Sequence, residues 1–495
     1  MKRKSLQVMA AAILFHFAGC NFSSKHPSDI SPNRVVPSEI QMAYHQMELI
    51  GFLHFSINTF TNREWGYGDE DPALFNPTQL NVEQWVTTAK SAGFGELILT
   101  AKHHDGFCLW PSSFTEHSIK NSSYKNGQGD LVREFVDVCR KHGIKTGLYL
   151  SPWDRNHADY GKPEYIIYYR NQLTELLTQY GEINEIWFDG AMGGDGHYGG
   201  ANETRKIDNK TYYDWDSTFA LVKRLQPGIS IFSDAGPDVR WVGNEQGFAG
   251  ETFWSTINRE KLIIGKSDQK YLNTGEPEGS HWIIGQCDVS IRPGWFYHQA
   301  EDSLVKSPRQ LVDIYYSSVG RNAVLLLNLP PDKRGLIHEN DVAALKSFKQ
   351  IIDETFAVNL AQSAMASANN YRHEHKKFSP ENVLDNNPKT YWATDDSVLP
   401  AQLTLTLNDE KQFDRIMIRE PVHLGQRVIR FQVEIMSDTG WQAIFEGTTI
   451  GYKRLIRIDP VTTSEVKLTI LEANNTVAIS EFGLFLSSVK DRNDY

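Results

Sequence analysis

Five side chains that could take part in a reaction lie at or near the ends of four short apolar segments. They are His54, His103, His104, Tyr149 and Asp189. If the segments are parallel strands, their carboxyl ends meet at one edge of the fold, so these side chains would surround a single pocket. A carboxylate fixed at the end of a buried strand can act as a nucleophile, and capping the next loop is its competing structural role. We therefore expect a catalytic function for Asp189.

A second carboxyl group would let such a pocket cleave a glycosidic bond. One carboxylate attacks the sugar carbon while the other group protonates the leaving oxygen, and in retaining enzymes the two lie about 5–5.5 Å apart. The candidates are Glu245 and Glu251, both in the segment 240–251. Spacing along the chain does not fix this distance, so the residues alone favour the two nearly equally. Solvent exposure without a function is the alternative for either one.

The adjacent histidines His103 and His104 also suggest a metal site, because imidazole is a common zinc ligand. Neighbouring residues on an extended strand point to opposite faces, so the pair would share an ion only if the strand end turned. The chain has no HxxEH-like motif and no Cys/His cluster. A metallohydrolase is therefore the weaker enzyme hypothesis, and we expect no cofactor for catalysis. An activity assay with a chelator separates the two mechanisms.

Short apolar segments alternate with helical patterns over the first two thirds of the chain. The strand candidates are 51–57, 96–100, 146–150, 183–188, 229–233 and 323–329. Between them apolar residues recur with helical spacing, for example at Val82, Val86 and Ala89. Repeated β/α units predict a (β/α)8-like barrel over residues 39–357. The stretch 247–294 shows no clear strand. A doubly wound sheet is the alternative, although no glycine-rich phosphate loop follows the first strand.

The periodicity of the sequence changes after Val358, from the helical repeat to a repeat of two residues. Apolar and polar residues alternate at 403–407, 431–435 and 466–470. Alternation of this kind predicts antiparallel strands with one buried face. We therefore expect a second domain, an all-β antiparallel sandwich, over residues 358–487.

The charge balance argues against a polyanionic partner. The chain has 50 basic and 61 acidic residues, a formal charge of −11, and no long basic run. Nucleic acid is therefore not expected as a ligand. The 12 tryptophans offer flat rings that suit the apolar faces of sugars, although most tryptophans in any protein pack in the core.

The first residues have the pattern of an export signal. Basic residues at 2–4 precede the apolar stretch 8–19, which is too short to span a bilayer as an ordinary helix. The sequence FAGC at 17–20 resembles the bacterial lipobox, with Phe17 in place of the usual leucine. This resemblance implies that Cys20 is lipidated and becomes the mature N-terminus.

These features predict an exported lipoprotein. We expect a signal peptide at 1–20, a flexible tether at 21–38, and a body whose only membrane contact is the lipid anchor. The residues after Cys20 include no acidic cluster of the kind that directs surface export, which favours the periplasm. An odd number of cysteines remains after Cys20, so a disulfide framework is not expected.

The barrel region resembles glycoside hydrolase family 29, the α-L-fucosidases, from about residue 40 to residue 356. The matching motifs are LHFS at 53–56, EWG at 64–66, AKHHDGF at 101–107, the tripeptide Gly147-Leu148-Tyr149, WFDG at 187–190 and LLNLPP at 326–331. The resemblance implies that Asp189 is the nucleophile and that Glu245, in a Gly-Asn-Glu motif, is the acid/base. It also implies sugar contacts by His54, Trp65, His103, His104, Tyr149, Trp187 and Arg240. Phe52 and Trp295 would form the apolar corner that a 6-deoxy sugar needs.

Two segments resemble the subgroup of this family that acts on branched glycans, namely 240–245 and DVSIRPGWFYH at 288–298. This implies a retaining exo-α-L-fucosidase that removes terminal α-1,3- or α-1,4-linked L-fucose from Lewis-type oligosaccharides. Gln286 stands where the subgroup's glutamate is expected, so a contact to the substrate or to a neighbouring side chain should differ. A broad-specificity α-L-fucosidase and an inactive glycan-binding lipoprotein are the alternatives. The presence of both candidate carboxylates argues against the inactive protein.

The sandwich region resembles the discoidin-like domains that include carbohydrate-binding module family 32. The matching motifs are NLA at 359–361, VLD at 383–385, TYW at 390–392 and ISE at 479–481. Members of this group often hold a structural Ca²⁺ ion with carboxylate and backbone oxygens. The resemblance implies Asp385 and Glu481 as its side-chain ligands. The alternative for Asp385 is that it caps a turn.

Overall fold

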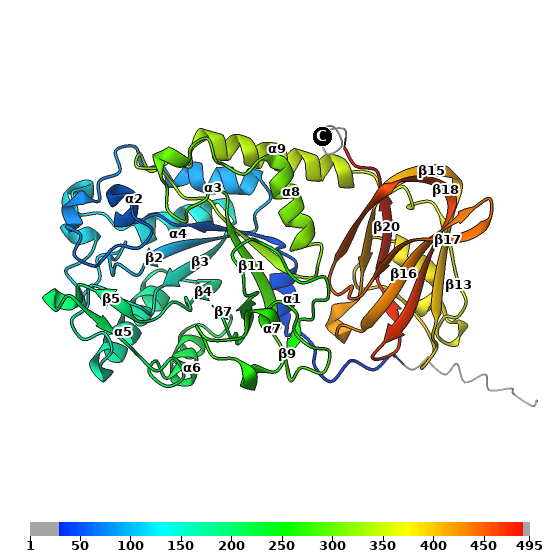
Figure 1. Ribbon diagram of the computed structural model, residues 1–495, viewed down its shortest axis with the longest axis horizontal. Helices are drawn as coiled ribbons and strands as arrows, with labels where there is room; N and C mark the ends of the chain where they lie inside the picture. The colour runs from blue at the N-terminus through cyan, green and yellow to red at the C-terminus, as the bar shows by residue number, and fades with distance from the viewer. Residues whose placement is uncertain (1–28, 489–495) are drawn as a thin grey trace, which may run out of the picture.

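The computed structural model describes residues 29–488 and contains two domains that lie side by side, a barrel and a β-sandwich (Figure 1). Within this range, eight parallel strands close the barrel in the order β1-β12-β11-β8-β7-β4-β3-β2. Their bounds are β1 Leu49–Leu53, β2 Glu96–Lys102, β3 Lys145–Leu150, β4 Glu185–Trp187, β7 Ser230–Ser233, β8 Val239–Trp241, β11 Ile284–Ser290 and β12 Val324–Asn328. The predicted (β/α)8-like barrel is confirmed.

The helices are α1 Glu39–His45, α2 Ile57–Thr61, α3 Val82–Ser91, α4 Leu131–His142, α5 Pro163–Gln179, α6 Trp215–Leu225, α7 Gln269–Leu272, α8 Pro308–Ser317 and α9 Glu339–Phe356. The longer helices lie around the outside of the barrel (Figure 1), whereas Tyr44 of α1 joins the cluster inside it. Helix α4 illustrates why these segments are helical. The Asp130 side chain accepts a hydrogen bond from the Arg133 amide at the helix start, and Gly143 ends the helix in the left-handed conformation.

Two barrel strands, β8 and β11, lie where the sequence predicts none. Strand β11 carries Gln286, Asp288 and Ser290 at alternate positions, all of them buried, so it lacks the apolar pattern of an ordinary buried strand. Strand β8 overlaps β7 only through the pairs Phe232–Val239 and Ser233–Arg240. The link between the two strands is also short, so the sequence has no helical pattern there that would indicate a β/α unit.

The second domain is an antiparallel β-sandwich, as predicted. Its strands are β13 Met365–Ala368, β14 Trp392–Ala393, β15 Ala401–Arg419, β16 Val428–Ser437, β17 Gly440–Gly447, β18 Arg454–Ala473, β19 Ala478–Ile479 and β20 Glu481–Phe485. The alternating leucines of β15 face the core: Leu403 pairs with Leu468, Leu405 pairs with Val466, and all four are fully buried. The barrel domain contains two additional short sheets of two strands each. They are β5 Gly194–Gly196 with β6 Glu203–Arg205, and β9 Thr256–Ile257 with β10 His281–Trp282.

The first described residues pack against the sandwich. Ile30 is 2% exposed and clusters with Phe378 and Tyr391, and the Asn33 amide donates a hydrogen bond to the Leu424 carbonyl at 2.8 Å. The prediction of a flexible tether is therefore wrong for residues 29–38, because an apolar side chain in this segment finds a buried site. The predicted signal peptide, the lipidated Cys20 and the rest of the tether lie outside the described residues.

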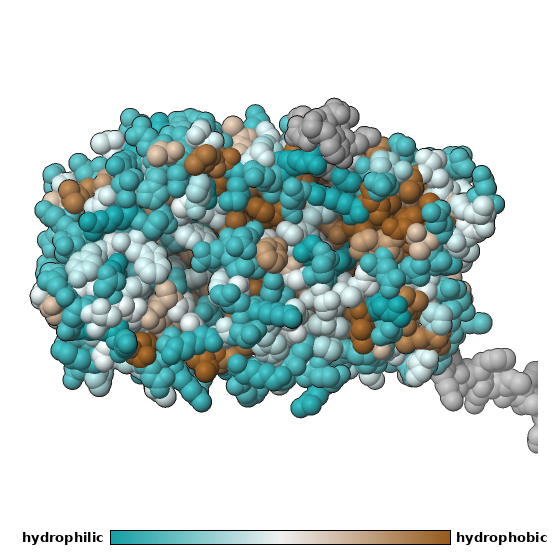
Figure 2. Space-filling view, in the orientation of Figure 1, coloured by the Kyte–Doolittle hydropathy of each residue, from teal (hydrophilic) through white to brown (hydrophobic). Residues whose placement is uncertain are grey.

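The surface is mostly hydrophilic on the face drawn in Figure 2, with small separate hydrophobic patches over both domains. Among residues 29–488, no helix combines the length and apolar character needed to cross a membrane.

Inside the barrel, Ile50, Ile98, Phe232 and Leu326 fill the centre and form a closed floor. Polar side chains beyond this floor lie at the carboxyl ends of the strands, where the loops enclose a cavity.

Candidate active site

A cavity of about 330 Å³ opens at the carboxyl ends of the barrel strands. Its walls are formed by Phe52, His54, Glu64, Trp65, His103, His104, Trp187, Asp189, Gly190, Ala191, Asp234, Trp241, Glu245, Gly265, Lys266, Ser267, Gln269, Asp288 and Trp295. The structure thus brings together both preferred carboxylates and most of the predicted sugar contacts. Two predicted residues do not line the cavity, namely Tyr149 and Arg240.

Asp189 lies two residues after the end of β4 and lines this cavity. Its Oδ1 accepts a hydrogen bond from the Ala191 amide at 2.7 Å, and its Oδ2 accepts one from the Tyr149 hydroxyl at 2.9 Å. Burial raises the pKa of Asp189, while these two donors counteract that effect by stabilising the anion. The side chain is 24% exposed, so the carboxylate is held firmly and is still accessible from the cavity.

Tyr149 itself is fully buried behind Asp189. Its ring stacks against His103 and Trp187, with centroid distances of 5.6 and 5.3 Å. The prediction of a sugar contact by Tyr149 is not supported by this placement. Its direct partner is the Asp189 carboxylate.

His104 presents an unprotonated nitrogen to the cavity. The Ser151 hydroxyl donates to the Trp153 carbonyl at 2.6 Å, so it must accept from His104 Nδ1, which lies 2.7 Å away. Burial lowers the pKa of His104 to about 3, which keeps the ring neutral. Its Nε2, 3.8 Å from Asp189 Oδ2, is therefore a hydrogen-bond acceptor.

His54 has the same tautomer for a similar reason. The Asn328 amide nitrogen donates to the Trp295 carbonyl at 2.7 Å, which fixes Asn328 Oδ1 as the acceptor facing His54 Nδ1 at 2.9 Å. Burial lowers the pKa of His54 to about 3. Two neutral imidazoles thus expose Nε2 acceptors that can bind hydroxyl groups.

His103 and His104 both line the cavity, which requires the strand end to turn. Strand β2 ends at Lys102 and the chain turns immediately afterwards, so the alternation of side chains no longer applies. The two rings lie 4.1 Å apart between centroids. Even so, no group of three or more His, Cys, Asp or Glu side chains among residues 29–488 could hold a metal ion.

Glu245 reaches the cavity from the loop after β8. Its Oε2 accepts a hydrogen bond from the Trp295 indole nitrogen at 3.1 Å. Burial is the main cause that raises the pKa of Glu245, and the nearby carboxylates Asp189 and Glu64 raise it further, while the Trp295 hydrogen bond acts in the opposite direction. The protonated form of Glu245 is favoured by these surroundings.

Glu251 lies elsewhere. It is 67% exposed, its carboxylate pairs with Arg321 and Arg454, and it is absent from the cavity walls. Of the two carboxyl groups that the sequence left open, only Glu245 shares a cavity with Asp189.

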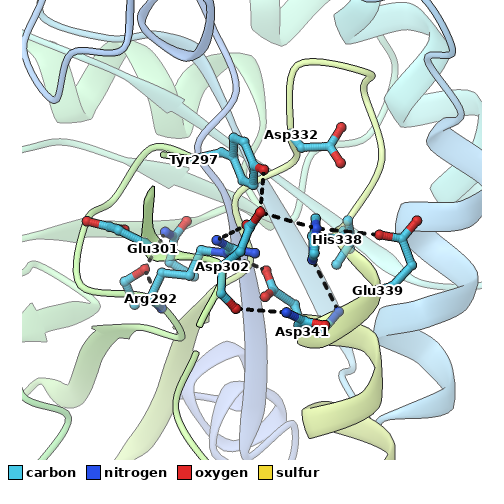
Figure 3. A network of polar contacts seen from close by, with 12 residues as sticks. Arg292, Tyr297, Glu301, Asp302, Asp332, His338, Glu339 and Asp341 are labelled. Atoms are coloured by element: carbon cyan, nitrogen blue, oxygen red, sulfur yellow. Dashed lines mark hydrogen bonds and ion pairs between the residues drawn. The ribbon is translucent and has the colours of Figure 1, made fainter. Parts of the chain in front are cut away.

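The loop that carries Trp295 is anchored at its start by a buried ion-pair network. Arg292 is fully buried; its Nε donates to Asp341 Oδ2 at 2.9 Å and its Nη1 donates to Asp302 Oδ1 at 2.9 Å. Figure 3 shows the two carboxylates on either side of the guanidinium group, with the Tyr297 hydroxyl also donating to Asp302, at 3.2 Å. This network fixes the backbone just before Trp295.

Glu64 fixes the same loop from the cavity side. Its two oxygens accept hydrogen bonds from the Trp295 amide at 2.8 Å and from the Phe296 amide at 3.1 Å, and His298 Nε2 lies 2.6 Å from Oε1. The backbone of Trp295, whose indole contacts Glu245, is therefore fixed by Glu64 from a different loop.

Aromatic rings form one corner of the cavity. The Phe52 ring lies 5.2 Å from that of Trp187 and 6.4 Å from that of Trp295 between centroids. Trp65 is 53% exposed and meets His104 edge to face at 5.3 Å. The cavity therefore combines polar acceptors with an apolar corner, and the acceptor His54 lies beside that corner, 4.5 Å from the Phe52 ring between centroids.

Arg240 does not contact the cavity. Its side chain is fully buried, and its guanidinium group donates to backbone carbonyls of Trp254, Leu272 and Ile283. The predicted sugar contact is wrong because side chains alternate along β8: Val239 belongs to the barrel interior, so Arg240 points outward beneath the loops. Arg240 holds these loops together instead.

Among the cavity residues that sequence reasoning missed, four have large polar or aromatic side chains at the strand ends or in the loops: Glu64, Asp234, Trp241 and Asp288. Asp234 directly follows β7, and Asp189 likewise lies just after β4, so the rule that strand ends carry functional groups could have identified Asp234. Its Oδ2 accepts from the Gly265 amide at 2.9 Å, and burial, followed by the charge of Asp189, raises its pKa to about 7. Asp288 Oδ1 is buried without a hydrogen-bond partner, and burial raises the pKa of Asp288 well above its usual range.

Gln286 contacts neighbouring side chains below the cavity. Its Oε1 accepts from the Trp187 indole nitrogen at 2.8 Å, and its amide nitrogen donates to the Tyr44 hydroxyl, which in turn donates to Glu185 at 2.9 Å. Burial raises the pKa of Glu185 well above its usual range. The glutamine at position 286, where the subgroup's glutamate is expected, therefore affects the hydrogen bond that holds the Trp187 indole.

The two predicted calcium ligands have protein partners. Asp385 accepts from the Asn387 amide at 2.9 Å and from the Thr390 hydroxyl at 2.7 Å, which is the turn-capping role. Glu481 Oε2 pairs with Arg419 Nε at 3.1 Å. Calcium binding by these two side chains is not tested by their protein partners and stays a prediction.

Comparison with known proteins covers both domains. Residues 32–354 match the family Alpha-L-fucosidase, and residues 363–482 match the F5/8 type C domain. Alpha-L-fucosidase 1 of Arabidopsis thaliana is 45% identical over 467 residues, which cover 93% of this chain and 89% of that protein. A solved glycoside hydrolase 29 family member from an unknown rumen bacterium is 42% identical with a TM-score of 0.82, covering 93% of this chain and 78% of that one. A Ruminococcus gnavus GH29 fucosidase in complex with fucose is 34% identical with a TM-score of 0.85, covering 94% and 97%.

Proposed function

The chain belongs to the alpha-L-fucosidase family, glycoside hydrolase family 29, and we propose that Asp189 and Glu245 carry out its reaction as nucleophile and acid/base. The chain is an α-L-fucosidase by this membership. The observation that carries the proposal is that two carboxyl groups share one cavity and have opposite surroundings. Asp189 accepts hydrogen bonds from two donors, which favour its anion. Glu245 accepts one, and its burial and the nearby carboxylates Asp189 and Glu64 favour its protonated form.

The reaction then takes place in two steps. In the first step, the Asp189 carboxylate attacks the anomeric carbon of fucose, the glycosidic C–O bond breaks, and Glu245 donates its proton to the leaving oxygen. In the second step, Glu245 takes a proton from water, the water oxygen attacks the anomeric carbon, and the ester bond to Asp189 breaks. Two inversions retain the configuration, and both carboxyl groups return to their starting protonation states.

The cavity walls support recognition of a 6-deoxy sugar. The Nε2 atoms of His54 and His104 are acceptors for sugar hydroxyl groups, because their Nδ1 atoms already donate to the protein. The corner formed by Phe52, Trp187 and Trp295 offers apolar surface to the methyl group of fucose.

Dependence on the leaving group tests the acid/base assignment. For Glu245→Ala, kcat/KM should fall about 10²–10⁴-fold on a fucosyl oligosaccharide, whose leaving alcohol needs a proton, and much less on an aryl fucoside with an acidic phenol. Azide should accelerate turnover of the aryl fucoside by this variant, since azide attacks the fucosyl-enzyme without a base. A selective loss of this kind in Glu251→Ala, with none in Glu245→Ala, would reverse the assignment.

We also propose that the natural substrates are branched glycans with α-1,3- or α-1,4-linked fucose. The segments 240–245 and 288–298 support this assignment, since they resemble the branched-substrate subgroup. Contact with the branching galactose would supply binding energy that stabilises the transition state. The test compares kcat/KM on Lewis a or Lewis x trisaccharide with that on 2′-fucosyllactose and an aryl fucoside. Comparable values on all of them would place the enzyme among broad-specificity fucosidases.

A lipid anchor at Cys20 in the periplasm completes the proposal. It rests on the export pattern of residues 1–20, and the packing of residues 29–38 on the sandwich means that an anchor would be attached beside that domain. A structural Ca²⁺ ion near Asp385 and Glu481 is a separate proposal. A rise in the melting temperature on addition of Ca²⁺, lost in Asp385→Ala, would support it.

A further inference from the structure

The segment 242–255, which carries Glu245, occupies the place where a helix would follow β8 and has almost no regular structure of its own. Its internal side-chain hydrogen bonds form one turn, in which Asn244 Oδ1 accepts from the Gln246 amide at 3.1 Å and Asn244 Nδ2 donates to the Phe248 carbonyl at 2.8 Å. The position of the Glu245 carboxyl group therefore depends on how the rest of the segment is fixed.

Arg454, the first residue of β18 in the sandwich, contacts this segment with two nitrogen atoms. Nη1 donates to the Glu251 carbonyl at 2.9 Å, and Nη2 donates to Glu251 Oε2 at 2.8 Å. The Arg454 side chain is 4% exposed, so it is a fixed group. Arg321 of the barrel donates to the other carboxylate oxygen of Glu251 and, at 2.9 Å, to the Ala249 carbonyl. Glu251 is thus held by one arginine from each domain.

Three further sandwich side chains bind the same stretch, namely Gln426, Thr448 and Thr449. Gln426 Oε1 accepts from the Ser255 amide at 3.1 Å, and its Nε2 donates to the Phe253 carbonyl at 2.8 Å. Thr449 Oγ1 accepts from the Phe253 amide at 2.9 Å, and Thr448 Oγ1 donates to the Glu251 carbonyl at 3.2 Å. We call Gln426, Thr448, Thr449 and Arg454 the sandwich clamp.

We propose that the sandwich domain is a positioning part of the active site: the sandwich clamp fixes the segment 251–255 and, through it, the Glu245 carboxyl group opposite Asp189. Figure 1 shows the sandwich directly beside the barrel, and the clamp residues do not line the cavity. They act through the backbone. The Ala249 amide donates to the Ser317 carbonyl at 2.8 Å, so only the turn around Asn244 separates this fixed stretch from Glu245.

This inference rests on the proposed acid/base function of Glu245, and it predicts a selective defect. Loosening the clamp displaces the proton donor but leaves Asp189 and the histidines in place, since these lie on other strands. Proton donation is needed for poor leaving groups and hardly at all for acidic phenols. The clamp variants should therefore resemble a weaker form of Glu245→Ala.

The experiment uses the full-length enzyme and measures kcat/KM on a fucosyl oligosaccharide and on an activated aryl fucoside. In Arg454→Met, kcat/KM for the oligosaccharide should fall about 10–100-fold, because a displacement of about 1 Å of a catalytic group costs up to that much. Its kcat/KM for the aryl fucoside should stay within about threefold of wild type, since that leaving group needs no proton. Thr449→Val, which removes a single acceptor, should show the same selectivity with a smaller loss.

Arg457→Met is the matched control, because Arg457 pairs with Asp313 of α8 across the same domain interface and does not touch the segment 242–255. It should behave like wild type on both substrates. Equal losses on both substrates in the clamp variants, no loss at all, or the selective loss in Arg457→Met would each overturn the inference. If circular dichroism shows that Arg454→Met does not fold, the result for Thr449→Val decides whether the inference holds. Glu245→Ala is the reference: without a leaving-group effect in that variant, the acid/base assignment itself fails.

Discussion

Replacement of Tyr149 by phenylalanine removes one hydroxyl group and leaves the ring in place. That hydroxyl donates to Asp189 Oδ2 at 2.9 Å, and Tyr149 is fully buried, so the change affects the nucleophile without altering the cavity walls. The ring keeps its stacking against Trp187. Asp189 keeps its second donor, the Ala191 amide. The variant therefore reports what a single hydrogen bond contributes to the ionisation of Asp189.

The magnitude follows from the charge of the acceptor. A hydrogen bond to an ionised group contributes about 1.5–3 kcal/mol, which corresponds to about a 10- to 100-fold change in an equilibrium constant. The full effect acts on ionisation, because the bond stabilises the carboxylate and is lost when the carboxyl group is protonated. Its removal raises the pKa of Asp189, so activity on the acidic side disappears at a higher pH than in wild type. In the first transition state the charge on Asp189 is already partly consumed. At the pH optimum, kcat/KM should therefore change less, by under about tenfold.

The assay is the pH dependence of kcat/KM on an aryl fucoside, which reports ionisations of the free enzyme. Tyr169→Phe is the control: Tyr169 is also buried, and its hydroxyl donates to the Leu150 carbonyl at 2.9 Å instead of to Asp189. We expect the acidic limb to move to higher pH in Tyr149→Phe only. An unmoved limb in Tyr149→Phe, or the same movement in both variants, would refute the reasoning.

Three further predictions concern separate parts of the chain. Asp189→Asn should keep its circular dichroism spectrum and lose essentially all turnover, because an amide cannot form the glycosyl ester; near-wild-type kcat would exclude Asp189 as the nucleophile. Gln286→Glu should lower the free energy of unfolding at neutral pH by about 1–3 kcal/mol, because it adds a carboxylate to the buried pair Glu96 and Glu185 and removes the donor to Tyr44. The loss should shrink as the pH falls, since protonation removes the added charge; urea titrations at two pH values check this, and a loss that stays constant would contradict it. Wild-type protein should partition into detergent and Cys20→Ser should not, as measured by phase separation and mass spectrometry of the N-terminus.

Much of the cavity could be predicted from the sequence with one rule, that functional groups lie at the carboxyl ends of the parallel strands. It predicted His54, His103 and His104 as cavity residues, and it placed Asp189 at the end of a strand that is buried throughout. The rule succeeds because a parallel barrel directs the carboxyl ends of its strands toward one opening. It fails where a strand is not recognised. Strand β11 is rich in buried polar residues, so Asp288 was not found even though its carboxyl group lines the cavity.

Arg240 marks a different limit. Resemblance to a motif gives a residue its place along the chain, but the direction of its side chain depends on the strand register. Val239 lies in the barrel interior, and the alternation of side chains then sends Arg240 to the outside, under the carbonyls of Trp254 and Leu272. The strand was not predicted, so its register could not be used.

The choice between Glu245 and Glu251 rested on the resemblance of the Gly-Asn-Glu motif alone, because both residues lie in one irregular segment and their spacing does not distinguish them. What separates them is a partner on the other domain: Arg454, 203 residues from Glu251 along the chain, binds its carbonyl and its carboxylate. With both Arg454 and Arg321 as partners, the Glu251 carboxylate is neutralised at the interface. Glu245 forms no ion pair within residues 29–488 and meets the Trp295 indole inside the cavity. A carboxyl group near other carboxylates and without a cation tends to hold its proton, which a general acid requires. Arg454 and Arg321 therefore give Glu251 a structural role, and because they pair with Glu251, Glu245 is left as the carboxyl group that can donate a proton.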